Sequence, residues 1–259
     1  MEKKEMDREP LLEIACFDHD SAVNAANGGA SRIELCQDYA SGGLSADATT
    51  LVTLKSRLSI PIFVMIRPHP RNFYYSDMEF EDMKDTLKTL KTLGADGFVF
   101  GILRRPETRT RYGWIDIERN KELVQLADGK PCTFHRAFDL IPEPYWDTTL
   151  AELIACGFSS ILTSGGSLGN QATDHTSALS RLHSRNHGLK SSEDLEIIIG
   201  GGVRSMNIQS LSQLTGGKSF HSSALVDGAT VVSIEETNRM CEFLAMECIG
   251  KKEGPIGSF

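Results

Sequence analysis

A short run near the middle of the chain joins an apolar stretch to ionisable side chains. Residues 131–139 read Pro-Cys-Thr-Phe-His-Arg-Ala-Phe-Asp, so His135, Arg136 and Asp139 directly follow a strand-like segment. A hydrophobic core does not require ionisable side chains at the end of a strand, and charged residues at that position usually lie in a cleft. The pattern recurs in three further segments, residues 33–36, 63–67 and 220–223.

Polar side chains from several of these segments are candidates for one site. Carboxylates beside arginine and histidine suit general acid–base chemistry or the binding of an anionic substrate. The catalytic hypothesis therefore assigns roles to Glu13, Glu34, Arg67 and His135, with His221 facing the same pocket. The alternative is that these groups form internal ion pairs that only fill the interior. Asp139 is expected to cap the following helix or to orient Arg136.

Glycine and serine residues near the carboxyl ends of three predicted strands indicate an anion site. Glycine lets a backbone approach an anion closely, and backbone N–H groups in such loops bind phosphate in many barrels. Tight turns alone are the alternative explanation. The candidate anion-binding residues are Ser164, Gly165, Gly200, Gly201, Gly202, Ser222 and Ser223.

Strand-like and helix-like segments alternate along the whole chain, and the strands are apolar, as buried parallel strands are. Eight such units in about 250 residues predict a TIM-like (β/α)₈ barrel. An open doubly wound sheet is the rival, but it would gather polar residues at one switch point rather than at nearly every strand end. The predicted strands are Leu11–Phe17, Arg32–Cys36, Ile62–Ile66, Gly97–Leu103, Cys132–Ala137, Ser160–Thr163, Glu196–Ile199 and Lys218–His221.

Capping patterns mark several helices between these strands. Residues 76–79, Ser-Asp-Met-Glu, form a capping box before an apolar stripe at helical spacing, and residues 233–236 form a second one before a helix to about Glu247. Asp116 is expected to cap a helix to Ala127, and Ser205 a helix that contains Ile208. A polar loop is predicted over Arg104–Gly113, a weak helix over Thr176–His183, and a further polar loop through Asp194.

Composition bounds the functional classes. The chain has 259 residues, 40% of them hydrophobic, and a formal net charge of −8. That charge argues against a nucleic-acid or anionic-membrane surface, and no apolar run approaches the roughly 20 residues that span a bilayer. The charged start is unlike a signal peptide, so a cytoplasmic protein is expected. One domain over residues 11–249 is predicted, with disordered tails over 1–10 and 250–259.

The six cysteines have no metal-finger spacing, and in a cytosolic protein they are expected to be free thiols. Most lie in apolar patterns typical of core residues. Cys36 differs, because alternation along a strand places it on the same face as Glu34.

Several of these segments, taken in order, are similar to one known family. Residues 32–36, 66–68, 73–76, 133–139, 162–165, 200–203 and 221–224 together resemble the CutC family, over a span from about Leu12 to Gly228. The resemblance implies a TIM-like barrel that forms homo-oligomers in the cytoplasm and, in some eukaryotes, the nucleus. It further implies copper(I) binding and a role in copper homeostasis, with no organic cofactor.

The family's proposed copper ligands are two cysteines near the ends of the first two strands. Cys36 matches the second, but Ala15 holds the first position and Cys16 follows one residue later. Because one residue along a strand reverses the side chain, Cys16 can serve only if the first strand ends there. Met65 is a further soft side chain that could ligate copper(I). The residues alone favour the competing hypothesis, a barrel enzyme of lyase or isomerase type that acts on a small phosphorylated or carboxylated substrate.

Overall fold

The computed structural model describes residues 9–188 and 195–250, and in it eight parallel strands close into one barrel. Each strand pairs with its sequence neighbours, and β8 pairs with β1. The predicted (β/α)₈ barrel is therefore confirmed, and the doubly wound sheet is excluded. The predicted disordered tails lie, apart from Glu9, Pro10 and Gly250, outside the described residues.

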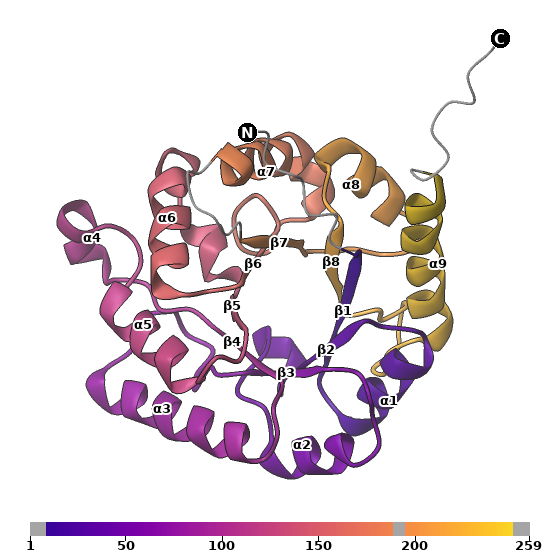
Figure 1. The fold of residues 1–259 in the computed structure, drawn as a ribbon, viewed down its shortest axis with the longest axis horizontal. Coiled ribbons are helices and arrows are strands. Elements are labelled where there is room, and N and C mark those ends of the chain that lie inside the picture. Colours follow the sequence, from indigo (N-terminus) through magenta and orange to yellow (C-terminus); the bar gives the residue numbers. More distant parts are fainter. Residues whose placement is uncertain (1–8, 189–194, 251–259) are drawn as a thin grey trace.

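Figure 1 looks down the barrel and shows the strands as an inner ring that the helices surround. The strands are β1 (Leu11–Cys16), β2 (Arg32–Leu35), β3 (Ile62–Met65), β4 (Gly97–Phe100), β5 (Cys132–Phe134), β6 (Ser160–Thr163), β7 (Glu196–Ile199) and β8 (Ser219–Ser222). The α-helices are α1 (His19–Asn27), α2 (Ala48–Lys55), α3 (Asp77–Thr92), α4 (Pro106–Tyr112), α5 (Ile117–Leu126), α6 (Trp146–Cys156), α7 (Thr176–Gly188), α8 (Ile208–Thr215) and α9 (Ile234–Gly250). The short 3₁₀ helices are η1 (Tyr39–Ser41), η2 (Arg136–Leu140), η3 (Glu143–Tyr145) and η4 (Ala172–His175).

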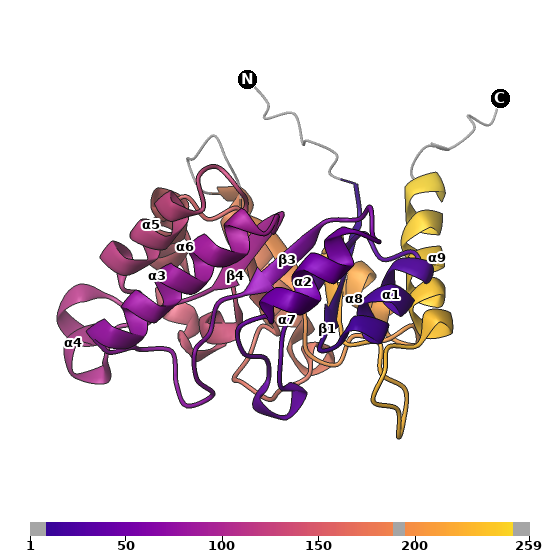
Figure 2. The ribbon, with the colours of Figure 1, turned by 90° about the horizontal axis from the view of Figure 1, so that it is seen from below.

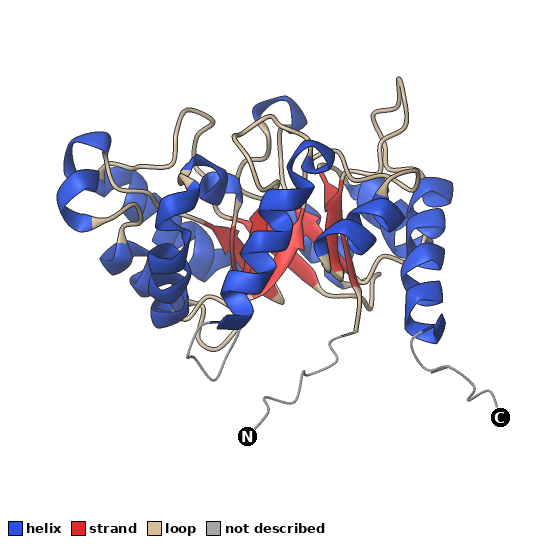
Figure 3. Cartoon of the chain, turned by 90° about the horizontal axis from the view of Figure 1, so that it is seen from above, coloured by secondary structure: helices blue, strands red, loops and turns tan. Residues whose placement is uncertain are grey.

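The two ends of the barrel differ. In the side view of Figure 2 the described chain enters β1 from the same end at which α9 finishes. Long loops gather at the opposite end, at the top of Figure 3, where the strands finish. Ligand sites of TIM barrels lie at this carboxyl end, which is here called the mouth of the barrel.

Alternation along the strands separates two cores. In β3, Ile62 and Val64 pack outward with the helices in the large cluster, whereas Phe63 and Met65 face the barrel interior. The interior cluster contains only Cys36, Phe63, Met65 and Val99, with Phe17 against it. This period of two is what strand geometry dictates, and it selects which side chains reach the mouth.

Gly97 of β4 makes room for one interior side chain. A Cβ atom built at Gly97 would lie 2.5 Å from the ring of Phe63, which is shorter than any real carbon contact. The Phe63 ring in turn lies beneath the guanidinium of Arg32, with the Arg32 Cζ 4.0 Å from the ring centroid. Gly97 therefore leaves room for the Phe63 ring, which packs against the buried guanidinium of Arg32.

Local sequence signals were largely correct about helix starts. Ser76 and Glu79 form the predicted capping box at α3, and Asp116 accepts from the Arg119 N–H at the start of α5. In the second predicted box Ser233 accepts from the Glu236 N–H, but the Glu236 side chain binds Ser205 instead of closing the box.

Three predictions about connecting segments were wrong. The expected polar loop over Arg104–Gly113 contains α4, because Pro106 at its first position fits a helix start. Helix α7 extends past His183 to Gly188, although the end of the loop predicted after it lies outside the described residues. Ser205 does not cap α8, whose N-cap position is Asn207. Across residues 9–188 and 195–250, no helix combines the length and apolar character needed to cross a bilayer.

Candidate functional site

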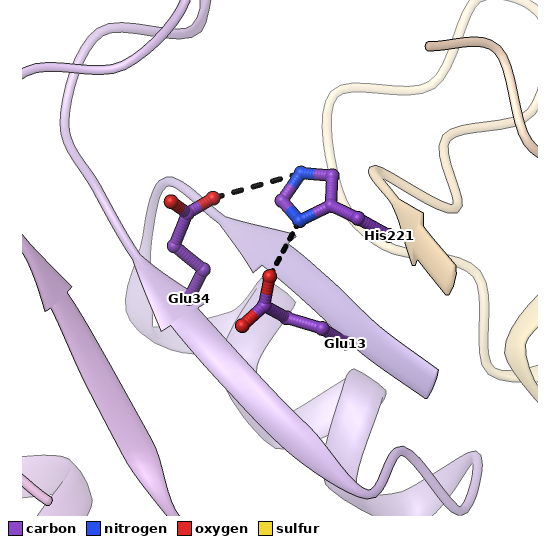
Figure 4. A group of neighbouring side chains, drawn as sticks. All are labelled: Glu13, Glu34 and His221. Carbon is purple, nitrogen blue, oxygen red and sulfur yellow. Dashed lines mark hydrogen bonds and ion pairs between the residues drawn. The ribbon is translucent and has the colours of Figure 1, made fainter. Parts of the chain in front are cut away.

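Four charged or titratable side chains of β1, β2 and β8 form a network inside the barrel: Glu13, Arg32, Glu34 and His221. Figure 4 shows three of them, Glu13, Glu34 and His221. Glu13 is its centre: Oε2 accepts from Arg32 Nε at 2.6 Å, and Oε1 accepts from His221 Nδ1 at 2.8 Å. The other ring nitrogen, His221 Nε2, lies 3.6 Å from Glu34 Oε2. Strand register explains the grouping, because Glu13 is the cross-strand partner of both Arg32 and His221.

The network separates the acidities of its two carboxyl groups. Burial alone would raise the pKa of Glu13, but Arg32 and His221 outweigh it and lower this pKa to about 2. Burial raises the pKa of Glu34 to about 7, because His221 only partly offsets it and Glu13 adds to it. Burial opposes protonation of His221, yet the two carboxylates raise its pKa. Glu34 is therefore suited to exchange a proton near neutral pH.

Arg67 lies at the end of β3, on the other side of the mouth. Its guanidinium donates from Nη1 to the carbonyl oxygens of Ser41 (3.0 Å) and Gly43 (2.9 Å), and from Nη2 to that of Pro70 (2.9 Å). The residue is only 7% exposed, and its Nε has no hydrogen-bond partner in the described part of the chain. It forms no ion pair with any carboxylate that the structure describes, which is unusual for a buried arginine.

His135 shares this side of the mouth with Arg67. The ring of Phe73 lies between them, 4.9 Å from the Arg67 Cζ and 4.8 Å from the His135 ring centroid. His135 Nδ1 accepts from the Ala137 N–H at 3.3 Å, which places the ring proton on Nε2. Burial and the nearby Arg67 lower the pKa of His135 to about 3, so the ring is neutral. His135 Nε2 is a buried donor for which the described residues provide no acceptor.

The structure thus divides the five predicted site residues between two groups. Glu13, Glu34 and His221 meet in one network, whereas Arg67 and His135 flank Phe73. Sequence reasoning missed Arg32, although its position two residues before Glu34 puts both on one strand face. It also gave no role to Phe73 or Tyr75, although both lie in the segment 73–76 that resembles the family.

Asp139 has the orienting role that was one of its two predicted alternatives. It accepts from Arg136 Nε at 2.7 Å and from the Ser164 N–H at 3.1 Å. Thr163 Oγ1 donates at 2.5 Å to Asp139 Oδ1, the oxygen that also accepts from the Ser164 N–H, whereas Arg136 binds Oδ2. Asp139 therefore connects the segment after β5 to the end of β6. The Ser164 hydroxyl donates to Asp139 and accepts from Arg136, so both of its hydrogen-bonding roles are already used within the protein.

The predicted anion-binding loops lie close together at the ends of β6, β7 and β8. Gly201 and Gly202 have φ angles of 101° and 71°, and a Cβ at Gly202 would lie 1.4 Å from Gln171 Oε1. These glycines are thus required by the turn and by the loop packed against it, whether or not an anion binds. Arg204, which sequence reasoning missed, donates to the hydroxyls of Ser222 and Ser223 at 3.1 Å each. Anion binding at Gly200 to Gly202 stays a prediction.

The two candidate copper ligands point in different directions. Strand β1 continues through Cys16, whose side chain packs in the outer cluster between strands and helices. Cys36 lies in the interior cluster with Met65, and both side chains reach Gly43: a Cβ there would be 3.4 Å from the Cys36 Sγ and 3.5 Å from the Met65 Cε. The two side chains therefore pack in different clusters, although the Cys36 N–H donates to the Cys16 carbonyl oxygen at 2.9 Å and the two backbones are adjacent. A copper site that uses both cysteines stays a prediction. Burial raises the pKa of both thiols well above its ordinary value.

Comparison with known proteins decides the family. Residues 10–226 match the sequence profile of the CutC family. The chain belongs to the CutC family. Over 214 residues it is 38% identical to the human copper homeostasis protein cutC homolog, covering 83% of this chain and 73% of the human protein. A CutC family protein of Chromobacterium violaceum is 36% identical over 83% of this chain and 81% of its own length.

A solved structure of this family supports the architecture as well. The CutC protein of Streptococcus agalactiae superposes with a TM-score of 0.74 at 29% identity, covering 83% of this chain and 98% of that one. The barrel described above is therefore an architecture that a solved CutC structure shares.

Proposed function

We propose that this CutC family member binds copper(I) at the mouth of the barrel through Cys36. The observation that carries the proposal is the shared position of Cys36 and Met65 in the interior cluster, where both reach Gly43. Copper(I) is soft and prefers thiolate and thioether sulfur. Relatives of this chain bear the name copper homeostasis protein, which agrees with such a site.

A thiolate and copper(I) neutralise each other, which suits a buried position. Because burial raises the pKa of the Cys36 thiol, the metal must displace a proton when it binds. Apparent affinity should consequently rise with pH. Met65 would provide a neutral second ligand and add no charge.

An anaerobic copper(I) titration against a competing chelator tests this proposal. The wild type should bind one tight equivalent, and Cys36→Ser should lose it. Cys16→Ser is the matched control, since Cys16 is equally buried but lies in the outer cluster. Met65→Leu, which keeps the volume, should weaken binding without abolishing it. Binding that survives in Cys36→Ser, or that disappears equally in Cys16→Ser, would contradict a site built on Cys36 and Met65.

A second candidate function is catalysis on a small phosphorylated or carboxylated molecule. The specific observation in its favour is the pair of buried donors, Arg67 Nε and His135 Nε2, that find no acceptor within the described ranges. Unmet buried donors are costly, and an anionic group is the kind of partner that such donors accept. Glu34, with a pKa of about 7, would supply the acid–base group of an isomerase or lyase reaction.

Thermal-shift screening with small phosphorylated and carboxylated metabolites tests the second candidate. A ligand should stabilise the wild type and Cys36→Ser alike, and should fail to stabilise His135→Ala or Arg67→Met. Arg204→Gln probes the glycine loops separately, because Arg204 contacts only neutral oxygens among the partners that the structure records for it. Stabilisation that persists in both His135→Ala and Arg67→Met would contradict an anion site between them.

Location and assembly complete the proposal. We expect a cytoplasmic homo-oligomer whose partners are copper or small anions, with neither nucleic acid nor membrane among them. The net charge of −8 agrees with the absence of polyanionic partners. Sedimentation analysis of the full chain would show a single species heavier than the monomer mass of 28.5 kDa, and a monomer would contradict the expectation.

A further inference from the structure

Glu34 is a buried carboxyl group with no cation in hydrogen-bond contact; the polar side chains beside it are His221 and the Cys36 thiol. It is 3% exposed, and its Oε1 has no hydrogen-bond partner in the parts of the chain that are described. Oε2 faces His221 Nε2 at 3.6 Å, which is too long for a hydrogen bond. Glu13, by contrast, is neutralised by Arg32. A buried carboxylate without a cation is costly, so the environment of Glu34 favours a positively charged partner.

The imidazole of His221 is held in the orientation of a metal ligand. Its Nδ1 donates to Glu13 Oε1 at 2.8 Å, and Arg32 fixes the other oxygen of Glu13. When His221 is neutral, this bond keeps the proton on Nδ1 and turns the lone pair of Nε2 toward Glu34 (Figure 4). A carboxylate that orients a histidine in this way is the usual support of a metal-binding imidazole.

We propose that a divalent transition cation of the Zn²⁺ type binds between His221 Nε2 and Glu34 Oε2, with Glu13 as the positioning residue. Glu13, Glu34 and His221 each offer one ligand atom, and these atoms lie within 4.8 Å of one another. Two ligand atoms about 2.1 Å from Zn²⁺ at a tetrahedral angle are about 3.4 Å apart. The observed 3.6 Å is thus close to the spacing that a shared ion imposes.

The proposed site lies beside Cys36, but its donor atoms differ from those of the copper(I) site. Carboxylate oxygen and imidazole nitrogen suit a borderline divalent ion, whereas copper(I) favours the sulfur of Cys36 and Met65. Only Glu34 and His221 come from the chain, so water or a bound anion would fill the remaining positions. The inference does not depend on either proposed function.

Zn²⁺ titration of the full chain, after treatment with a chelator, tests the inference. The experiment is run in wild type and in Cys36→Ser, which removes the nearest interior thiol. Both should bind one equivalent, and X-ray absorption of the Cys36→Ser complex should show nitrogen and oxygen ligands. Glu34→Gln should weaken binding at least ten-fold. Glu13→Gln should weaken it about 10- to 100-fold through the lost orientation of His221.

Controls separate this outcome from surface binding and from misfolding. His175→Gln removes a histidine outside the network, and it should leave the affinity unchanged. His221→Gln is the second variant, in case Glu34→Gln fails to fold by circular dichroism. One equivalent that persists in both Glu34→Gln and His221→Gln, or that is lost in Cys36→Ser, would overturn the inference. A failed copper(I) titration would leave this result unaffected.

Discussion

The two sides of the barrel mouth treat buried polar groups in opposite ways. On the side of β1, β2 and β8, Glu13 is bonded to both Arg32 and His221, so opposite charges meet. On the side of β3 and β5, Arg67 Nε and His135 Nε2 are buried donors, and neither has a hydrogen-bond acceptor among the described residues. Most of these side chains are buried on both sides, and His221 alone among those named is partly exposed. The difference lies in whether the protein itself supplies the partner.

This contrast separates a structural role from a binding role. A network that is complete without a ligand stabilises the fold, whereas unmet donors and acceptors indicate where something else binds. Glu34 Oε1 and Arg32 Nη2 are the two unmet atoms of the first side. On the first side, Glu13 has hydrogen-bond partners for both of its oxygens and stabilises the fold, whereas Glu34 Oε1 has none and could accept from a ligand.

The largest effect is expected at that centre. Glu13→Gln leaves Arg32 and His221 buried without their counter-charge, which should lower the free energy of unfolding by about 3 to 5 kcal/mol. Denaturant unfolding measures this loss. The matched control is Glu235→Gln in the exposed Glu235–Arg239 pair of α9, which should cost no more than about 0.5 kcal/mol. A loss below about 1 kcal/mol for Glu13→Gln would mean that the network adds little to stability.

The pH dependence of stability should be of intermediate size, with opposite signs for the two carboxyl groups. Glu13 has a folded pKa of about 2, below its ordinary 4.5, so its stabilisation is complete above pH 4.5 and is lost as the pH falls toward 2. Glu34 has a folded pKa of about 7, above its ordinary 4.5, so its contribution is complete below pH 4.5 and is lost as the pH rises toward 7. Unfolding of the chelator-treated wild type should thus become easier by about 1 to 3 kcal/mol between pH 4.5 and 7.

Glu34→Gln provides the comparison, because the amide does not titrate. Its stability should change less than that of the wild type over the same range. His221 also loses stabilisation as the pH rises through its raised pKa, so the variant should retain a smaller slope of the same sign. An unchanged slope in Glu34→Gln would assign the whole effect to His221.

Strand alternation made most of the fold and part of the site predictable. The period of two along a strand predicts that Glu34 and Cys36 share one face. It also predicts that Cys16 lies on the face of β1 opposite to Glu13. Pairing across strands was not predictable, because it depends on register: Glu13 meets Arg32 and His221 only because these residues lie opposite it in β2 and β8. Register between neighbouring strands cannot be derived from one sequence when the strands are connected by helices instead of tight turns.

The loops were harder to predict than the strands for a related reason. Arg204 and Phe73 act through contacts with segments distant in sequence, so neither has a local pattern that marks it. The glycine triplet illustrates a pattern with two explanations, and anion binding there stays a prediction. Its composition suggested an anion site, but packing against Gln171 already accounts for Gly202.

The smallest effect on stability is expected from a buried hydroxyl on the side of β3 and β5. Tyr75 is 3% exposed, and its Oη makes no close hydrogen bond among the described residues, although the Arg67 guanidinium interacts with it, so Tyr75→Phe should change stability by no more than about 0.5 kcal/mol. Thr163→Val is the matched comparison. It removes a buried hydroxyl that bonds Asp139 and the Gly165 N–H, and it should cost about 1 to 3 kcal/mol. If denaturant unfolding gives equal losses for the two variants, the Tyr75 hydroxyl already has an acceptor. The contrast between the two sides, and with it the anion site, would then rest on Arg67 Nε and His135 Nε2 alone.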